Sequence, residues 1–284
     1  MTITLGGNSY GKSAVRMMKV VRTGAHHVIR EFTADIALEG EFAAAHADGD
    51  NRVVLPTDTM KNTVYAKARE LELRSPDEFA LALAAHFIEA SPPSYLARVR
   101  IAEHGWRRLD VRGAAHDHAF TRASNELRIA QAEVSRGGQS RHVAGIEDLL
   151  ILKSAQSAFS GYPRDRYTTL KETGDRILAT AVSAHWTYRH HADLDFDAGF
   201  ASARAALLDT FADHVSKSVQ HTLYAMGEAV LAASETVEDI TITMPNKHHL
   251  LVDLSAFGLD NPNEIFVPTS EPYGLISATV RREP

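Results

Sequence analysis

Two apolar runs enclose the polar stretch Leu152-Lys-Ser-Ala-Gln-Ser-Ala-Phe159-Ser-Gly-Tyr-Pro-Arg-Asp-Arg-Tyr-Thr-Thr-Leu-Lys-Glu-Thr-Gly-Asp-Arg176-Ile-Leu-Ala-Thr180. Its content of Arg, Thr, Asp and Gly is too high for a packed core, so it predicts a loop. Phe159 stands among small residues, which leaves one face of its ring uncovered for a flat ligand. Arg176 precedes the return of regular structure, where a stiff element would hold its planar fork of donors. A solvated loop with a packed Phe and a surface Arg is the alternative interpretation.

Regular structure around this loop follows a repeated order. In the first half, alternating or Val-rich runs predict strands at 14–23, 27–38, 95–101 and 126–134. Helices are expected to begin near Thr57 and at Ser75, where Ser75-Pro-Asp-Glu78 offers a cap, a first-turn Pro and a capping box. The stretch 41–51 is expected to be a loop.

The second half shows the same sequence of elements. Strands are predicted at 143–154, 175–189, 239–245, 250–254 and 275–281, with a long helical region between 196 and 230. This order differs from the strand–helix alternation of a doubly wound parallel sheet. We therefore predict an α+β protein with antiparallel sheets and paired helices on one face. The Gly-containing segment 135–140 divides it into domains 1–137 and 138–284.

The composition excludes several classes of function. The 284 residues are 44% hydrophobic, enough for ordinary soluble cores, and carry a net charge of −6. An acidic chain does not suit nucleic acid, which normally requires a basic face. Without cysteine there is no disulfide, thiolate nucleophile or Cys-based metal site. No apolar run is long enough to span a bilayer, so no membrane partner is expected.

The two ends of the chain predict a cytoplasmic protein. The start, Met1-Thr-Ile-Thr-Leu-Gly-Gly7, lacks the basic region and apolar stretch of a signal peptide. The end, Arg281-Arg-Glu-Pro284, is not the Ser-Lys-Leu peroxisomal address.

One motif suggests a different class of protein. Gly6-Gly-Asn-Ser-Tyr-Gly-Lys-Ser13 fits the phosphate loop of an NTPase, and Leu250-Leu-Val-Asp253 has the form of a magnesium-binding strand. A phosphate loop needs a strand before it and a helix after it. Only a short apolar run precedes the motif, and the Val-rich sequence that follows favours a strand. A phosphate-loop NTPase is therefore an alternative that the structure can decide.

Paired histidines raise the question of a metal site. His116 and His118 would share one face of a strand, as a ligand pair requires. No Glu or His recurs at the spacing of a known zinc helix, and adjacent histidines such as His26-His27 point to opposite faces of a strand. We expect no metal, and the Gly-x-Gly-x-x-Gly dinucleotide fingerprint is missing from the sequence.

Two positions in the first half have the chemistry of a site. Lys12 follows a glycine that lets the backbone approach closely, and a lysine that accepts a proton must first lose its charge. Thr57 is expected to cap its helix. A helix N-terminus also presents free N–H groups to an anion, so the capping role is compatible with ligand binding.

Three positions in the second half add polar groups. Gln220 lies near a break between two helices, where its amide presents both a donor and an acceptor to a ligand edge. Alternation places Asn246 and His248 on one face of a strand, so both side chains can enter the same pocket.

These residues belong to an ordered set of motifs. The stretch from Phe159 to Arg176 resembles the substrate loop of the urate oxidase (uricase) family. Further motifs of that family follow in the same order: Tyr10-Gly-Lys-Ser-Ala-Val-Arg16, Thr57-Asp-Thr-Met-Lys-Asn-Thr-Val-Tyr65, Ser218-Val-Gln220 and Pro245-Asn-Lys-His248. The resemblance covers essentially the whole chain. Gly174 departs from the family pattern, in which a larger residue is common.

The resemblance implies an oxidoreductase that needs no cofactor and no metal. It would convert urate, O2 and water to 5-hydroxyisourate and hydrogen peroxide. Phe159 would stack on the purine, Arg176 and Gln220 would grip its opposite ends, and the Val219 backbone N–H would add one hydrogen bond.

The resemblance also implies residues for the chemical steps. Lys12, through the Thr57 hydroxyl and with His248 nearby, would relay a proton from urate. Asn246 would hold O2, and later water, above the ring. Thr57 and Asp58 would bind substrate from a neighbouring subunit.

The same resemblance names the fold. It is the tunnelling fold (T-fold), with two such domains per chain and a barrel formed between subunits, which removes exposed sheet edges. The active unit would be a homotetramer with its sites at subunit interfaces. A pterin-handling T-fold enzyme is the alternative, since it would share the architecture but generally needs metal or a different acid–base set.

Overall fold

The computed structural model describes residues 3–190 and 193–283. Met1, Thr2 and Pro284, which enter the localisation prediction, lie outside the described residues. The chain forms two compact units, Met1–Gly145 with Thr187–Asp197, and Ile146–Trp186 with Ala198–Pro284.

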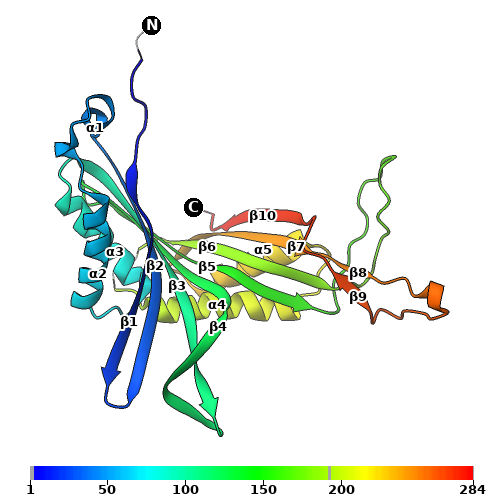
Figure 1. Cartoon of the computed structure of the whole chain (residues 1–284). Helices are drawn as coiled ribbons and strands as arrows, with labels where there is room; N and C mark the ends of the chain where they lie inside the picture. Colours follow the sequence, from blue (N-terminus) through cyan, green and yellow to red (C-terminus); the bar gives the residue numbers. More distant parts are fainter. Residues whose placement is uncertain (1–2, 191–192, 284) are drawn as a thin grey trace. The chain divides into compact units, whose positions relative to one another are not determined.

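Four long strands form the sheet of the first unit. Each strand is antiparallel to its neighbour, in the order β1-β2-β3-β4. Their bounds are Tyr10–Thr23 (β1), His26–Gly40 (β2), Ser94–Val111 (β3) and Ala114–Ser135 (β4). The helices α2 (Thr57–Glu70) and α3 (Pro76–Ala90) lie along one face of this sheet (Figure 1). β3 and β4 are longer than predicted. The sequence pattern does not indicate their extra length, because the hairpin that joins them is largely exposed and lacks an alternating apolar pattern.

Alternation in β2 explains which face the helices cover. Every second side chain of its second half is at most 3% exposed: Phe32, Ala34, Ile36 and Leu38. The buried face of α3 packs in the same core through Phe79, Leu83 and Phe87. Burying one side chain of this size stabilises the fold by about 1.5–3 kcal/mol, so this core fixes the helices to the sheet.

The start of α3 agrees with the predicted cap. The Ser75 side chain accepts a hydrogen bond from the Glu78 backbone N–H at 3.1 Å, and Pro76 is the first helical residue. The helix ends at Ala90, directly before Ser91.

The stretch 41–51 is not the loop that was predicted. It contains the short helix α1 (Ala43–Ala47), and the 3-10 helix η1 (Asn51–Val53) begins at its end. Three consecutive alanines have the highest helix propensity, and the fully buried Phe42 anchors them. Gly49, with a φ of 68°, only marks the end of this helix.

The second unit repeats the plan of the first. Its strand order is β5-β6-β7-β10, with bounds Ser140–Lys153 (β5), Leu178–Tyr188 (β6), Val237–Lys247 (β7) and Gly274–Arg281 (β10). The first residues of β5, up to Gly145, and the last two of β6 belong to the first unit. The predicted helical region consists of α4 (Phe196–Asp213) and α5 (Val219–Ala233). α5 packs on β7 and β10. Gly227 permits this approach, because an added Cβ would lie 2.5 Å from Cγ2 of Val280.

A separate two-stranded sheet follows β7. It pairs β8 (His249–Leu251) with β9 (Phe266–Pro268). The strand predicted at 250–254 is therefore too long at its C-terminal end, where the 3-10 helix η2 (Ser255–Phe257) soon follows. β9 was missed because three residues carry too little periodic pattern.

Antiparallel strands with a pair of longer helices in each unit, α2 with α3 and α4 with α5, confirm the predicted α+β class. Within the described part of the chain, no helix combines the length and the apolarity that crossing a membrane requires.

Candidate functional site

The predicted site residues divide between the two units. Lys12, Thr57 and Asp58 belong to the first unit. The second unit holds the others: Phe159, Arg176, Val219, Gln220, Asn246 and His248.

Lys12 lies at an irregularity in β1. It pairs with Ile36 of β2, and the register shifts between Lys12 and Val15. At this bulge Ala14 has a φ of 56° and donates its N–H to Oδ1 of Asp35 at 2.8 Å. A bulge re-aims the side chains beside it, and Lys12 is only partly exposed.

Gly11 is required next to Lys12 for the close approach that its position suggested. A Cβ at Gly11 would lie 1.8 Å from the carbonyl oxygen of Ile36. The tight contact is therefore with β2 of the same unit, and any side chain there would displace β1.

The continuous strand also decides against the phosphate-loop alternative. Lys12 and Ser13 both lie within β1 rather than at the start of a helix. A phosphate loop needs the N–H groups of a helix N-terminus directly after its Gly-Lys-Ser. The match of Gly6–Ser13 to that motif is therefore coincidental.

Thr57 is not the helix cap that was predicted. Pro56 occupies the N-cap position of α2, no side chain caps the helix, and Thr57 is its first helical residue. Pro56 has a φ of −55° and a ψ of 134°, so it is not helical itself, and a proline disfavours an α conformation in Leu55 before it. The helix therefore begins directly after Pro56, at Thr57. The Thr57 hydroxyl is thus not used for capping, and it lies beside the free N–H groups of the first turn.

Asp58 is exposed in the first turn of α2 and is held by its own helix. Lys61 forms an ion pair with it, and Nδ2 of Asn62 donates to it at 3.1 Å. The hydrogen bond and charge of Lys61 lower the pKa of Asp58, and the charge of Lys12 acts in the same direction. The first unit therefore brings Lys12 and Asp58 into electrostatic range of each other.

Tyr10 ties the two elements of this cluster together. Its hydroxyl accepts a hydrogen bond from the Leu55 backbone N–H at 2.8 Å, two residues before Thr57. Its ring packs edge-on against Phe42 at 4.7 Å between centroids. The sequence marked Tyr10 only as a motif residue, and this anchoring role has no signal in the pattern.

In the second unit, Phe159 and Arg176 lie together. The Arg176 guanidinium carbon is 5.2 Å from the centroid of the Phe159 ring. Burial lowers the pKa of Arg176, although a guanidinium stays charged in proteins. Its buried Nε has no hydrogen-bond partner among the residues that the structure describes. Leaving a buried donor without an acceptor is costly, so we expect a ligand to provide the acceptor for Arg176 Nε.

The Phe159 ring is less open than predicted. Tyr162 stacks on it, with 4.9 Å between the centroids and 15° between the planes. The Tyr162 hydroxyl donates to the Leu170 carbonyl at 2.8 Å. One face of Phe159 is therefore covered from within the loop, because the turn at Gly161, with a φ of 72°, brings Tyr162 back over the ring.

The loop itself contains ordered pairing that its polar composition did not predict. Phe159 and Thr173 exchange two backbone hydrogen bonds of 2.9 and 3.1 Å. On the other side, Ala158 N–H donates to the Ser216 carbonyl at 2.8 Å, and Ser216 N–H donates to the Gln156 carbonyl at 2.9 Å. Gly174 lies in open space, with no atom within 4 Å of an added Cβ, so a larger residue would fit there.

Val219 and Gln220 are the first two residues of α5, as the predicted helix break requires. Ser218 caps the helix by accepting the His221 backbone N–H at 3.1 Å. Helix geometry leaves the N–H groups of Val219 and Gln220 without intrahelical acceptors. The Val219 side chain is buried, whereas Gln220 is exposed and free to contact a ligand.

Asn246 and His248 lie at the end of β7. Asn246 is 8% exposed and continues the buried face of Ile242 and Met244. β7 ends at Lys247, so His248 lies one residue beyond the strand, where its carbonyl accepts the Thr269 N–H at 2.9 Å. The shared strand face predicted for the two side chains therefore reaches only as far as Asn246.

His116 and His118 are the histidine pair that the sequence singled out as possible metal ligands, and both lie in β4. The rings of His116 and His118 contact each other at 4.7 Å between centroids. In the described residues, no three His, Cys, Asp or Glu side chains are placed to hold one metal ion.

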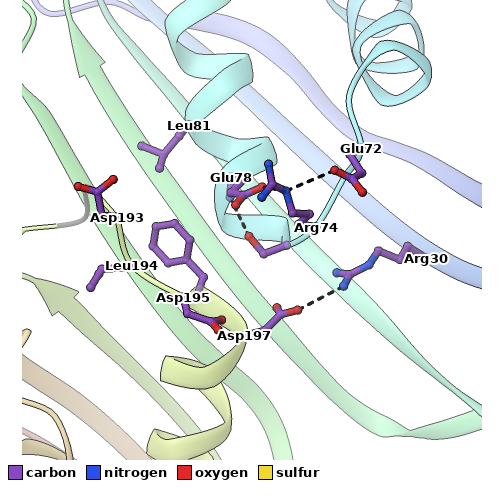
Figure 2. A pocket seen from close by; sticks show the side chains of 11 residues that line it. Arg30, Glu72, Arg74, Glu78, Leu81, Asp193, Leu194, Asp195 and Asp197 are labelled. Carbon is purple, nitrogen blue, oxygen red and sulfur yellow. Dashed lines mark hydrogen bonds and ion pairs between the residues drawn. The ribbon is translucent and has the colours of Figure 1, made fainter.

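A groove in the first unit is not the candidate site. It has a volume of about 1020 Å³ and is lined by charged residues near the start of α3 and by residues 193–197 (Figure 2). Arg30 pairs there with Asp197 at 3.4 Å, and Arg74 with Glu72 at 3.5 Å. Among the described residues that line this groove, none is a predicted site residue.

Comparison with known proteins decides the family. The sequence model of the family described as "Uricase" matches residues 8–133 and 142–277. The chain belongs to the uricase family. The uricase of Arthrobacter globiformis is 48% identical over 281 residues, which are 99% of this chain and 91% of that protein. The uricase of Aspergillus flavus is 41% identical over 288 residues, with 96% and 95% covered.

Solved uricases share the fold. The crystal structure of the uricase from Arthrobacter globiformis matches with a TM-score of 0.94 at 48% identity, over 100% of this chain and 96% of that chain. A uricase from Bacillus fastidious matches with a TM-score of 0.85 at 24% identity, over 96% and 93%. The second likeness concerns the fold alone. The uricase architecture thus agrees with the predicted T-fold class.

Proposed function

We propose that this chain is a urate oxidase. It converts urate, O2 and water to 5-hydroxyisourate and hydrogen peroxide. Membership of the uricase family supports the reaction, and one observation in the structure carries the assignment of the site. The buried Arg176 Nε has no acceptor among the described residues and lies beside the Phe159 ring, an arrangement that fits a flat, oxygen-rich ligand.

The second unit grips the purine. Phe159 stacks on the ring through the face that Tyr162 leaves open. Arg176 and Gln220 hydrogen-bond opposite ends of the purine, and the Val219 N–H at the start of α5 adds one more donor. A purine without the matching oxygens would leave these donors unpaired, so the same groups set specificity.

The first unit supplies the proton relay. Lys12 takes a proton from urate through the Thr57 hydroxyl, with His248 nearby, and Asp58 adds a substrate contact. The resulting electron-rich anion reduces O2 directly, so the substrate provides the electrons that a cofactor usually provides. Asn246 holds O2, and later water, above the ring.

The relay and the grip come from different subunits in this proposal. The active unit is a homotetramer in the cytoplasm, built from two T-fold domains per chain, 1–137 and 138–284. Sheets of neighbouring subunits join into a barrel, which pairs the edge strands. Thr57 and Asp58 then complete the site of a neighbour.

A pterin-handling T-fold enzyme is the remaining alternative. It would share the architecture but would need a metal or another acid–base set. One assay separates the two: purified protein is treated with chelator, dialysed, and mixed with urate while urate absorbance and peroxide are followed. Equal amounts of urate lost and peroxide formed support the proposal. Activity that disappears with chelation and returns with metal contradicts it.

A further inference from the structure

The short segment from Gln156 to Phe159 connects the gripping residues. Its N–H groups alternate between two neighbours. Ala158 bonds to Ser216, which leads into α5 and Gln220. Phe159 bonds to Thr173, which leads into Arg176. The segment therefore acts as the middle strand of a small three-stranded arrangement within the second unit.

Asp175 completes one side of this arrangement with its side chain. Oδ1 of Asp175 accepts the Ser157 backbone N–H at 3.0 Å. The Asp175 carbonyl accepts the Thr173 hydroxyl at 2.7 Å, which shapes the turn before Arg176. The Asp175 carboxylate thus accepts a backbone N–H that a carbonyl of a neighbouring strand would accept in a regular sheet. Asp175 directly precedes Arg176.

We propose that Asp175 is a positioning residue of the urate site, and this proposal rests on the proposed function. Its carboxylate holds the segment of Phe159 against the segment of Arg176. The ring and the guanidinium then stay 5.2 Å apart before substrate arrives. Asp175 itself makes no contact with urate in this role.

The charge of Asp175 also acts on Lys153. It raises the pKa of Lys153 of β5, whereas burial, the larger effect, lowers that pKa. Lys153 donates to the His214 carbonyl just before α5, and its ammonium lies 5.7 Å from the Phe211 ring centroid. Asp175 thus interacts with the Phe159 segment and, through Lys153, with the residues that precede α5.

A small displacement of the segments that carry Phe159 and Arg176 should lower the reaction rate. Groups that hold a substrate must keep a near-attack arrangement, and a misplacement of about 1 Å costs up to about a hundredfold in rate. Hydrogen bonds to ionised acceptors are roughly twice as strong as neutral ones, which suits a link in a loop with little core.

The experiment compares Asp175→Ala with Asp175→Asn. Asparagine keeps an Oδ1 that can accept the Ser157 N–H, so it should retain most of the function. For Asp175→Ala we expect KM for urate and the inhibition constant of xanthine to rise together by about tenfold, with a smaller fall in kcat. Xanthine serves as a non-reactive purine that needs the same grip.

A matched control lies in the same loop. Asp165 also accepts a backbone N–H through Oδ1, from Tyr167 at 2.9 Å, and is exposed. Asp165→Ala removes the same kind of bond, together with the bond that the Thr168 hydroxyl donates to Oδ1 at 2.8 Å, without touching the Phe159 or Arg176 segments. Its KM for urate should stay near that of the unmodified enzyme.

Hydrogen exchange provides a readout that does not depend on turnover. Peptides covering 155–160 should exchange faster in Asp175→Ala than in Asp175→Asn, while those of β10 stay unchanged. If Asp175→Ala lowers only the melting temperature and leaves KM, xanthine inhibition and exchange as in Asp165→Ala, the positioning role is overturned. An unmodified enzyme that does not consume urate overturns the proposed function, and exchange still decides whether Asp175 holds this segment.

Discussion

The two parts of the candidate site are built in different ways. In the second unit, backbone pairing, a ring stack and a capped helix hold Phe159, Arg176 and Gln220 in one connected structure. In the first unit, Lys12 lies at a strand bulge and Thr57 begins a helix, and Tyr10 links the two elements through the Leu55 N–H. The contrast teaches that the residues of the proposed grip are preassembled, whereas those of the proposed relay lie on separate elements.

The difference extends to exposure. Arg176 is buried enough to leave Nε without an acceptor among the described residues, whereas Asp58 is exposed on its own unit. An exposed carboxylate beside Lys61 does not need a partner for stability, since surface pairs contribute at most about 1 kcal/mol. Its exposure is what a contribution to a neighbouring subunit would require.

The largest expected effect comes from breaking the relay. Lys12→Met should lower the rate of urate oxidation by about a hundredfold or more, the loss typical of removing a general base. Inhibition by xanthine should survive, because Lys12 is not a gripping group. Steady-state kinetics with both purines measures this, and near-normal turnover would remove Lys12 from the mechanism.

Breaking the grip should change binding instead. Arg176→Ala removes at least one hydrogen bond from a charged donor, which contributes about 1.5–3 kcal/mol, so affinity for xanthine should fall by roughly tenfold to a hundredfold or more. Arg166→Ala is the control, since Arg166 is exposed in the same loop and donates to the neighbouring Tyr167 hydroxyl. Unchanged affinity in Arg176→Ala, measured by calorimetry or competitive inhibition, would refute the grip.

A smaller effect of pH should appear near the start of α5. Burial lowers the pKa of His214, and the charges of His221 and Lys153 lower it further. A depressed folded-state pKa contributes stability above the unfolded value of about 6.5. That contribution is lost as the pH falls through the folded-state pKa.

The melting temperature should therefore fall between about pH 7.5 and about pH 5.5, and His214→Asn should reduce this fall by roughly a few degrees. A second variant replaces His221, whose ring centroid lies 4.3 Å from that of His214 and whose charge lowers the pKa of His214. An identical fall in the original chain and in His214→Asn would assign the acid sensitivity to other groups.

Much of the fold was predictable because its elements carry strong periodic patterns. The buried alternation of β2 and the Ser75 cap of α3 follow from local sequence alone. Predictions from weaker patterns were wrong in two places. The Ala run after the buried Phe42 forms the helix α1 instead of a loop, and Pro56 rather than Thr57 is the N-cap of α2.

The candidate site was predicted mainly through motifs. The residues themselves left Phe159 and Arg176 as a loop aromatic and a loop arginine, and their mutual contact became visible only in three dimensions. Tyr162 and Asp175 gave no signal, because a stacking partner or a long-range carboxylate acceptor depends on how the loop returns on itself.

The central claim is that relay and grip come from different chains. Subunits with Thr57→Ala are mixed with subunits with Arg176→Ala under conditions that allow exchange. A symmetric interface between the two contains one site with both parts intact, so urate oxidation should return. Mixing Phe159→Ala with Arg176→Ala is the matched control and should restore nothing, because both changes lie in the gripping part. Restored activity in the first mixture alone supports the account. No restoration, despite exchange proven by mass spectrometry, would place the whole site within one chain.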